Sequence, residues 1–455
     1  MLNLTPAQQQ SIGLTHILRQ LSPASPYGTE ALRKIAPYTD PAALNRHYDN
    51  IQKLMTHDLI SLRDTLAHFK NIRGILAKLA GGTLSEVELF ETKGFLLTLE
   101  RFLPVFNEIN ARLQLSDIAF APMTPALDIL DPQKARIAPF SLDDGFSDVL
   151  EALRRGRAQL APTNITQEEI AEELRIMSNL AIQLRPHIPR FAANIDNLAR
   201  LDLTMAIAAL AAQYSCTRPI ITQSTITLEN MTNPMISAAL AETGRAMTPI
   251  SLSLGTGTTI ITGANMGGKS VTIKTASLNV ALCALGLFAF ADHAETPLFD
   301  GIFLVSQDLQ DAAAGLSSFG GEVMSLNDLA TRLPQDFLFV ALDEPARTTN
   351  PAEGAAIVRA IAAWLADSRA ITILATHYDN ITAPNAKHYR VAGLTNLPPS
   401  LTQASIADHM DYRLVESTAN DPIPRDALKI CKLLGLDEGL MERIERQYSE
   451  NRETL

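Results

Sequence analysis

Hydrophobic residues are spaced differently in the two halves of the chain. Through most of residues 1–215 apolar side chains recur every three or four positions, as at Leu14, Ile17 and Leu18, which is the spacing of one helix face. The pattern therefore predicts an almost entirely helical first half. The expected helical stretches cover residues 58–80, 84–114, 143–160 and 163–214, and the proline- and aspartate-rich interval 119–139 is expected to be irregular.

The stretch over 163–214 carries its own start and break signals. Thr166 begins the sequence Thr-Gln-Glu-Glu, which resembles a capping box at a helix N-terminus. Pro186 and Pro189 lie inside the same stretch and remove backbone donors there, so we expect them to interrupt or kink the helix.

Short runs of β-branched and other apolar residues predict buried strands in the second half. These runs cover residues 258–262, 337–342 and 371–376, and their length is typical of strands with both faces covered. Residues 271–287 are apolar over a greater length and predict a buried helix. The second half thus combines strands with helices.

A glycine-rich loop joins the first of these strands to the apolar helix. The loop matches the pattern of glycine, four free positions, glycine, lysine and serine. Its residues are Gly263, Ala264, Asn265, Met266, Gly267, Gly268, Lys269 and Ser270. A strand, such a loop and a helix together point backbone N–H groups and a helix N-terminus at an anion. Lys269 is expected to reach the β- and γ-phosphates of ATP, and the Ser270 hydroxyl is expected to hold Mg²⁺.

Two carboxylates follow the apolar run 337–342 directly. Asp343 and Glu344 occupy the place where nucleotide hydrolases hold Mg²⁺ and orient the attacking water. We therefore expect Asp343 to bind the metal opposite Ser270, and Glu344 to act as the general base.

Charge and composition narrow the class of protein. The chain carries a net charge of −11, divided into −2 over residues 1–230 and −9 over residues 231–455, so the basic footprint usual for DNA binders is absent overall. The longest apolar run is too short for a membrane span, and the N-terminus does not resemble a signal peptide. Cys216, Cys283 and Cys431 are widely separated, which suits a reducing cytoplasm.

The hexapeptide Asn265–Ser270 resembles the phosphate loop of the MutS family of DNA mismatch-repair ATPases. The resemblance implies an α + α/β fold in which a helical domain precedes an ABC-type P-loop ATPase domain. The implied parts are a helical core and lever over residues 1–215 with a reduced clamp at roughly 100–160, the ATPase domain over 216–420, and a helical dimerisation segment over 421–455.

The resemblance also assigns roles to individual residues. His377 follows the run 371–376 in a Thr-His-Tyr sequence and would contact the γ-phosphate or the attacking water. Ser317 and Ser318 correspond to a signature segment that contacts the nucleotide bound by the other subunit of a dimer.

The chain departs from the family in two places. Thr232-Asn233-Pro234 replaces an Arg-His-Pro triplet, which leaves the adenine contacts open. Both glycines of the loop after Glu344 are also replaced, so that loop is expected to be stiffer.

Two functions remain open at this level. In the first, a dimer of the chain with itself or with a MutS-like paralogue hydrolyses ATP with Mg²⁺ and binds DNA without a mismatch-reading wedge, because the chain is expected to begin at the core domain. Arg154, Arg155 and Arg157 would then contact phosphates. In the second, the same ATPase remodels a protein partner, as short MutS-like proteins are associated with cobalamin-dependent aminomutases. Family membership favours DNA, whereas the acidic charge favours a protein partner.

Overall fold

The computed structural model describes residues 2–137, 140, 142, 146–160, 166–263, 268–305, 318–394, 410–418, 428, 431–432 and 435–453. For residues 156–160, 318, 410 and 448–453 it describes the backbone alone. No helix in these ranges is long and apolar enough to cross a membrane. All three cysteines are free thiols.

The chain forms two units. Residues 21–35 and 45–212 form a helical unit, and residues 1–20, 36–44 and 213–455 form a second unit that contains every described strand. An α part and an α/β part are therefore both present, as the sequence predicts. The division differs from the expected boundary at residue 215, because residues 1–20 and 36–44 also belong to the strand-containing unit.

Hydrogen bonds within the strand-containing unit explain why the N-terminal segment belongs to it. The Ile302 N–H donates to the Leu2 carbonyl at 3.1 Å, and the Gln8 side chain donates to the Leu304 carbonyl at 2.8 Å. The buried Asn233 amide donates to the Ile12 carbonyl at 3.0 Å. These partners lie hundreds of residues from the N-terminus, so the helical pattern of the first half could not reveal them.

The helical unit contains nine α-helices and one 3₁₀ helix among its described residues, two of them extending past its limits. They are α3 (Pro26–Arg33), α4 (Pro41–Met55), α5 (Ile60–Ala67), α6 (Arg73–Gly81), α7 (Glu86–Leu113), α8 (Thr124–Leu130), α9 (Asp148–Leu160), α10 (Gln167–Leu184), η1 (Arg185–His187) and α11 (Ile188–Gln213). The described parts of the expected helical stretches are helical apart from their ends and residues 68–72, which separate α5 from α6. The interval 119–139 is not wholly irregular, because α8 forms there with Pro125 in its first turn.

The break in the long stretch is confirmed. Thr166 accepts a hydrogen bond from the Glu169 N–H, and the Glu169 side chain accepts one from the Thr166 N–H, so the capping box at the start of α10 is complete. Pro186 lies in η1, which separates α10 from α11.

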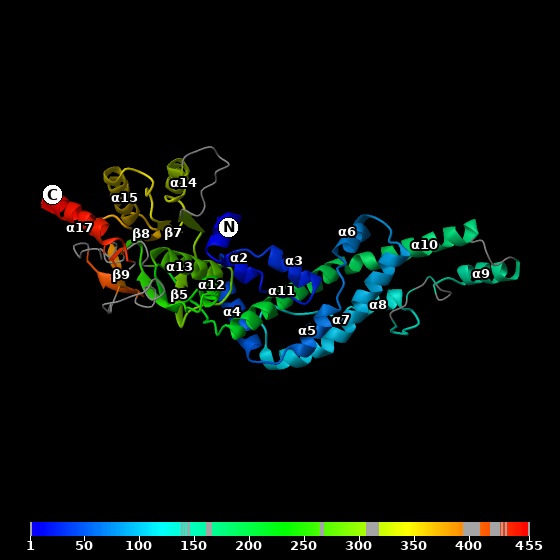
Figure 1. Ribbon diagram of the computed structural model, residues 1–455. Coiled ribbons are helices and arrows are strands. Elements are labelled where there is room, and N and C mark those ends of the chain that lie inside the picture. The colour runs from blue at the N-terminus through cyan, green and yellow to red at the C-terminus, as the bar shows by residue number, and fades with distance from the viewer. Residues whose placement is uncertain are drawn as a thin grey trace. The chain divides into compact units, whose positions relative to one another are not determined.

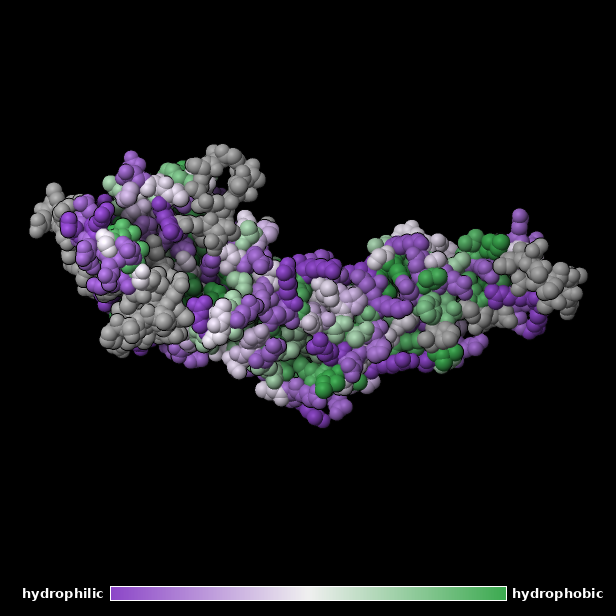
Figure 2. Space-filling model, in the orientation of Figure 1, coloured by the Kyte–Doolittle hydropathy of each residue, from purple (hydrophilic) through white to green (hydrophobic). Residues whose placement is uncertain are grey.

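Exposed apolar residues occur along α10 at Ile170, Leu174 and Ile182. Figure 2 shows patches of hydrophobic residues on the surface of the helical unit.

The strand-containing unit holds two sheets. One has the strand order β1-β5-β2-β3, and the other has the order β10-β9-β4-β8-β7-β6. In the larger sheet all neighbours are parallel except β10, which is antiparallel to β9. The strands are β1 (Ile220–Thr222), β2 (Ile226–Met231), β3 (Ile250–Leu254), β4 (Gly257–Thr262), β5 (His293–Pro297), β6 (Gly301–Val305), β7 (Leu338–Asp343), β8 (Ile371–Thr376), β9 (Lys387–Leu394) and β10 (Met410–Ser417).

Helices cover both faces of the larger sheet (Figure 1). Helix α13 packs against β7 and β8, while α15 and α14 pack on the other face. On that face Ile260, Val340 and Leu374 contact Val358 and Leu365 in one buried cluster. The helices among the described residues of this unit are α1 (Pro6–Ser11), α2 (Leu14–Leu18), α12 (Pro234–Ala241), α13 (Lys269–Ala284), α14 (Ser318–Arg332), α15 (Pro351–Ala366) and α17 (Glu438–Glu453).

A buried carboxylate ties α11 to the start of α3 inside the helical unit. Asp202 is 2% exposed and accepts hydrogen bonds from the Ala24 N–H at 2.8 Å, the Ser25 N–H at 2.7 Å and the Ser25 hydroxyl at 2.6 Å. A Cβ on Gly28 would lie 2.2 Å from the same carboxylate, so only glycine fits there. This one side chain therefore satisfies the backbone of the turn that precedes α3.

We expect Asp202→Ala to lower the free energy of unfolding by about 3 kcal/mol, because three donors to a charged group lose their buried acceptor. Urea denaturation followed by far-ultraviolet circular dichroism measures the change. Asp196→Ala on the same helix is the control. Asp196 is exposed and pairs with Arg73, so its loss should cost less than about 1 kcal/mol. Equal stabilities of the two variants would contradict the assignment.

Candidate functional site: a phosphate loop at the ends of three parallel strands

Strand register brings the predicted motifs together. Thr262 at the end of β4 pairs with Thr376 at the end of β8, and Asp343 at the end of β7 pairs with Ala375. The three strands are parallel and adjacent, so the segments that follow them leave the same edge of the sheet. Ligands bind at this edge in open α/β sheets. The phosphate loop, the Asp343-Glu344 pair and His377 therefore converge.

The described ends of the phosphate loop require glycine. Gly263 has φ +149° and Gly268 has φ +83°, which are values that other residues rarely adopt. A Cβ on Gly268 would also lie 2.9 Å from the Tyr412 ring. Gly268 precedes α13, and no described side chain caps the N-terminus of that helix, so its N–H groups are available to an anion. Ala264, Asn265, Met266 and Gly267 lie outside the described residues.

Lys269 is buried and faces the Glu344 carboxylate. Its Nζ donates to the Gly263 carbonyl at 2.7 Å and lies 3.1 Å from Glu344 Oε1. Burial lowers the pKa of Lys269, and the nearby Glu344 charge opposes that shift. The lysine is therefore held between the loop that would receive phosphates and the carboxylate that would activate water.

Glu344 lies at the centre of a cluster of basic groups. Arg347 Nη1 lies 3.1 Å from Glu344 Oε2, and His377 Nδ1 lies 3.6 Å from the same oxygen. Burial lowers the pKa of His377, which favours the neutral imidazole. In that state it can either accept or donate a hydrogen bond at a bound phosphate or water.

The backbone after β7 is strained. Glu344 has φ +49° and Ala346 has φ +58°, and each costs about 1–2 kcal/mol for a residue with a Cβ. Both residues are buried. The Glu344 N–H donates to the Ala375 carbonyl of β8 at 3.0 Å, which attaches the start of this loop to the neighbouring strand. The Glu344 carboxylate is thus positioned by a constrained loop.

Asp343 and Ser270 fit a divalent cation. Burial raises the pKa of the Asp343 carboxyl, and the Ser270 hydroxyl hydrogen-bonds to it. Asp343 Oδ1 has no hydrogen-bond partner among the described residues although it is buried. A carboxylate and a hydroxyl are hard oxygen ligands, and Mg²⁺ completes its shell with water and phosphate oxygens. The described residues contain no cluster of three or more acidic, histidine or cysteine ligands.

Some predicted residues lie outside this centre. Ser317 is not among the described residues, and the backbone of Ser318 begins α14. Asn233 is fully buried and caps α12 by accepting hydrogen bonds from the Met235 and Ile236 N–H groups. This structural role accounts for Asn233 in the triplet that departs from the family.

The arginines predicted to contact DNA are on α9. Arg154 Nη2 lies 3.1 Å from Glu173 of α10, and Arg155 pairs with Glu151 one turn away. The side chain of Arg157 lies outside the described residues. Each described arginine is therefore already matched by a carboxylate, and a phosphate would have to replace that partner.

Sequence reasoning missed two aromatic residues at the site. Tyr412 of β10 contacts Gly268, and the Tyr378 ring packs against His377 with ring centroids 4.3 Å apart. Tyr378 was visible as part of the Thr-His-Tyr sequence, but its hydroxyl partner lies on another loop. Tyr412 is far from the loop in sequence and approaches it only because β9 and β10 extend the sheet beyond β4.

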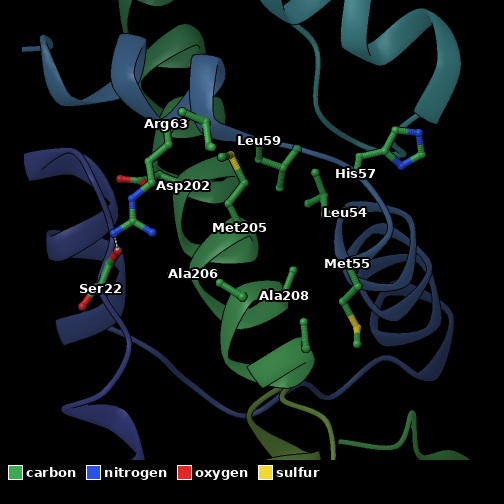
Figure 3. A pocket seen from close by; sticks show the side chains of 13 residues that line it. Ser22, Leu54, Met55, His57, Leu59, Arg63, Asp202, Met205, Ala206 and Ala208 are labelled. Atoms are coloured by element: carbon green, nitrogen blue, oxygen red, sulfur yellow. Dashed lines mark hydrogen bonds between the residues drawn. The ribbon is translucent and has the colours of Figure 1, made fainter. Parts of the chain in front are cut away.

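A hollow in the helical unit has a different chemistry from the site at the edge of the larger sheet. Figure 3 shows this cavity of about 260 Å³ between α11 and the segment around α4 and α5. Its lining is mostly apolar and includes Leu54, Met55, Leu59, Ile60, Met205, Ala206, Ala208, Ala209 and Ala212. Arg63 at its edge donates to the Ser22 carbonyl at 3.1 Å. The hollow has no glycine loop or carboxylate pair and does not resemble a nucleotide site.

The fold and site define a P-loop protein, and comparison with known proteins shows what the chain is similar to. MutS domain V matches residues 259–449. Endonuclease MutS2 of Leuconostoc citreum (strain KM20) is 31% identical over 277 residues, covering 60% of this chain and 33% of the relative. DNA mismatch repair protein MutS of Streptococcus pyogenes serotype M49 (strain NZ131) is 28% identical over 298 residues, covering 64% and 34%. The chain is therefore similar to MutS-family proteins, with the family's domain V matched over residues 259–449. It matches about a third of the length of these relatives.

The Lys269–Glu344 contact generates a binding prediction. Lys269→Ala should abolish ATP binding, because the phosphate-facing charge is removed. Glu344→Gln should bind Mg·ATP more tightly, by about tenfold, which corresponds to 1.4 kcal/mol, because the lysine no longer pairs with a carboxylate. Titration with a fluorescent ATP analogue measures both. Lys78→Ala, an exposed lysine of the helical unit that pairs with Glu88, is the control. Weaker binding by Glu344→Gln would contradict the prediction.

Proposed function

We propose that the chain is an ATPase that hydrolyses ATP with Mg²⁺ at sites shared between two subunits. The observation that carries this proposal is the convergence of Lys269, Asp343 and Glu344 at the carboxyl ends of β4 and β7. Such a set binds phosphates, holds the metal and orients water. Lys269 would leave Glu344 for the β- and γ-phosphates when ATP binds, and this exchange would free the Glu344 carboxylate for the attacking water.

The chemistry can be divided among the residues of this chain. Asp343 and Ser270 would hold Mg²⁺, which neutralises phosphate charge when bound. Glu344 would accept a proton from the attacking water, while His377 would orient that water or the γ-phosphate. Arg347, beside the carboxylate, would stabilise charge that develops on the transferred group.

The position of α14 supports a site completed by a second subunit. The segment that leads to Ser318 follows β6, and β6 is three strands from β4 in the sheet, a separation of about 14 Å. The strand that precedes α14 in the chain is therefore offset from the strand that precedes the phosphate loop. A second copy or a MutS-like paralogue would bring its α14 to the exposed side of the nucleotide.

The hydrolysis prediction tests the proposed function. Glu344→Gln should hydrolyse ATP at least about 10²-fold more slowly, the usual scale for losing a general base, while still binding nucleotide. Phosphate release from the wild type and the variant measures this. Hydrolysis by Glu344→Gln at the wild-type rate would show that the water is activated elsewhere.

Subunit mixing tests the shared site separately. Lys269→Ala and Ser317→Ala/Ser318→Ala subunits should each be inactive alone but recover part of the activity when mixed, because each mixed dimer keeps one complete site. A mixture that exchanges subunits without recovery would contradict the shared-site arrangement while leaving the hydrolysis prediction standing.

We propose DNA binding as the output of the ATPase, with a protein partner as the second candidate. The similarity to MutS-family proteins supports DNA. Three observations favour a protein partner. They are the ion pairing of Arg154 and Arg155, the net charge of −11, and the exposed apolar residues of α10 at Ile170, Leu174 and Ile182. An ATPase rate that is unchanged by duplex DNA at low salt would favour the protein partner.

Binding of DNA through arginine–phosphate contacts should weaken as the salt concentration rises. It should not distinguish a mismatched from a matched duplex, because phosphate contacts carry no base information. Titration of matched and G·T-mismatched duplexes at several salt concentrations measures this. Arg154→Ala/Arg155→Ala should reduce the salt slope by about 0.9 for each arginine that neutralises a phosphate in the wild type. Arg112→Ala, an exposed arginine on α7 paired with Glu108, is the control. A mismatch preference that survives high salt would contradict the prediction.

A further inference from the structure

The peptide groups of Ala346, two residues after Glu344, are held from both sides by other elements. The Ala346 N–H donates to Glu322 Oε2 of α14 at 2.9 Å. The Ala346 carbonyl accepts from the Tyr378 hydroxyl at 3.0 Å and from the Thr349 hydroxyl at 2.7 Å. Ala346 is 1% exposed and lies in the left-handed backbone region. These bonds hold the loop in a conformation that alanine does not favour.

The contact from Tyr378 requires glycine on a neighbouring helix. A Cβ on Gly354, in the first turn of α15, would lie 2.1 Å from the Tyr378 hydroxyl and 2.8 Å from the Thr349 hydroxyl. The Tyr378 ring also packs against His377. The hydroxyl therefore reaches the Ala346 carbonyl through a space that only glycine leaves open, and the same ring supports the histidine beside Glu344.

Glu322 connects this loop to a distant part of the proposed site. It lies four residues after Ser318, about one turn along α14, and its carboxylate reaches the loop 24 residues away in sequence. In the shared-site arrangement, the N-terminus of α14 faces the nucleotide phosphate bound by the other subunit. A displacement of α14 would therefore be transmitted to the loop that carries Glu344.

We propose that Glu322 and Tyr378 are positioning residues that hold Glu344 through the Ala346 peptides, and that Glu322 couples nucleotide phosphate at the partner's site to hydrolysis at its own. The inference rests on the proposed ATPase function. It assigns to α14 a second role within its own subunit, besides its contact with the partner's nucleotide. The hydrogen bonds of Glu322 and Tyr378 with Ala346 also explain how an alanine can remain in the left-handed backbone region.

The experiment compares variants that remove or keep each hydrogen bond. Glu322→Ala and Tyr378→Phe should each lower kcat by about 10- to 100-fold, the scale expected when a reacting group is misplaced by about 1 Å, with ATP affinity unchanged. Glu322→Gln should recover most of the rate, because its amide oxygen can still accept from the Ala346 N–H. Burial raises the pKa of Glu322, so a neutral amide of the same shape is a fair substitute.

Two controls separate positioning from folding. Asp328→Ala removes an exposed carboxylate from the same helix and should leave kcat unchanged. Gly354→Ala should reproduce the loss seen in Tyr378→Phe, because its Cβ occupies the path of the hydroxyl. Binding of a fluorescent ATP analogue shows that each variant is folded. If Glu322→Ala does not fold, Tyr378→Phe, which removes a single oxygen, still tests the Ala346 contact.

The coupling has its own readout. In the wild-type dimer, nucleotide at one site should promote hydrolysis at the other, so the rate should depend cooperatively on ATP concentration. Glu322→Ala should form dimers, shown by light scattering, and lose that cooperativity. Retained cooperativity, or a wild-type kcat in Glu322→Ala and Tyr378→Phe, would overturn the inference while Glu344→Gln stays inactive. Equal losses in Glu322→Gln and Glu322→Ala would also overturn it. A Glu344→Gln variant as active as wild type would instead overturn the proposed function.

Discussion

The parallel register of β4, β8 and β7 is the constraint on which the rest of the site depends. The three strands end within one residue of each other, because Thr262 pairs with Thr376 and Asp343 pairs with Ala375. A shift of one residue in any pairing would turn every side chain of that strand to the opposite face. The buried clusters on both faces of the sheet therefore protect the geometry of the phosphate loop, the carboxylate pair and His377.

Burial at this edge of the sheet destabilises the charged forms of the ionisable groups there. It lowers the pKa values of Lys269 and His377 and raises that of Asp343, so each group is less stable in its charged form than it is in water. The Lys269–Glu344 pair offsets part of that cost without a ligand. In the proposed function, nucleotide phosphates and a divalent cation would supply opposite charges for the same groups. The charged forms of these groups would then be stabilised when the nucleotide binds.

The loop after β7 shows how strain and support combine. Glu344 and Ala346 occupy left-handed conformations without being glycine. Hydrogen bonds that they donate to β8 and α14, and one that Ala346 accepts from Tyr378, hold them there. The stiffer loop expected from the missing glycines stays a prediction. The helical unit uses a similar device at a structural position, where the Asp202 carboxylate holds the turn before α3.

Local chemistry allowed the sequence to predict the phosphate-loop motif, the strand ends, the capping box at Thr166 and the break at Pro186. Each depends on residues a few positions apart, where backbone sterics and capping bonds decide the outcome. Tertiary structure alone decided that the N-terminal segment joins the strand-containing unit, that Tyr412 lies against Gly268, and that Glu322 and Tyr378 meet at Ala346. Those last contacts join residues 24 and 32 positions apart. They exist only because strand order and helix packing bring separate segments to one edge, which no local pattern encodes.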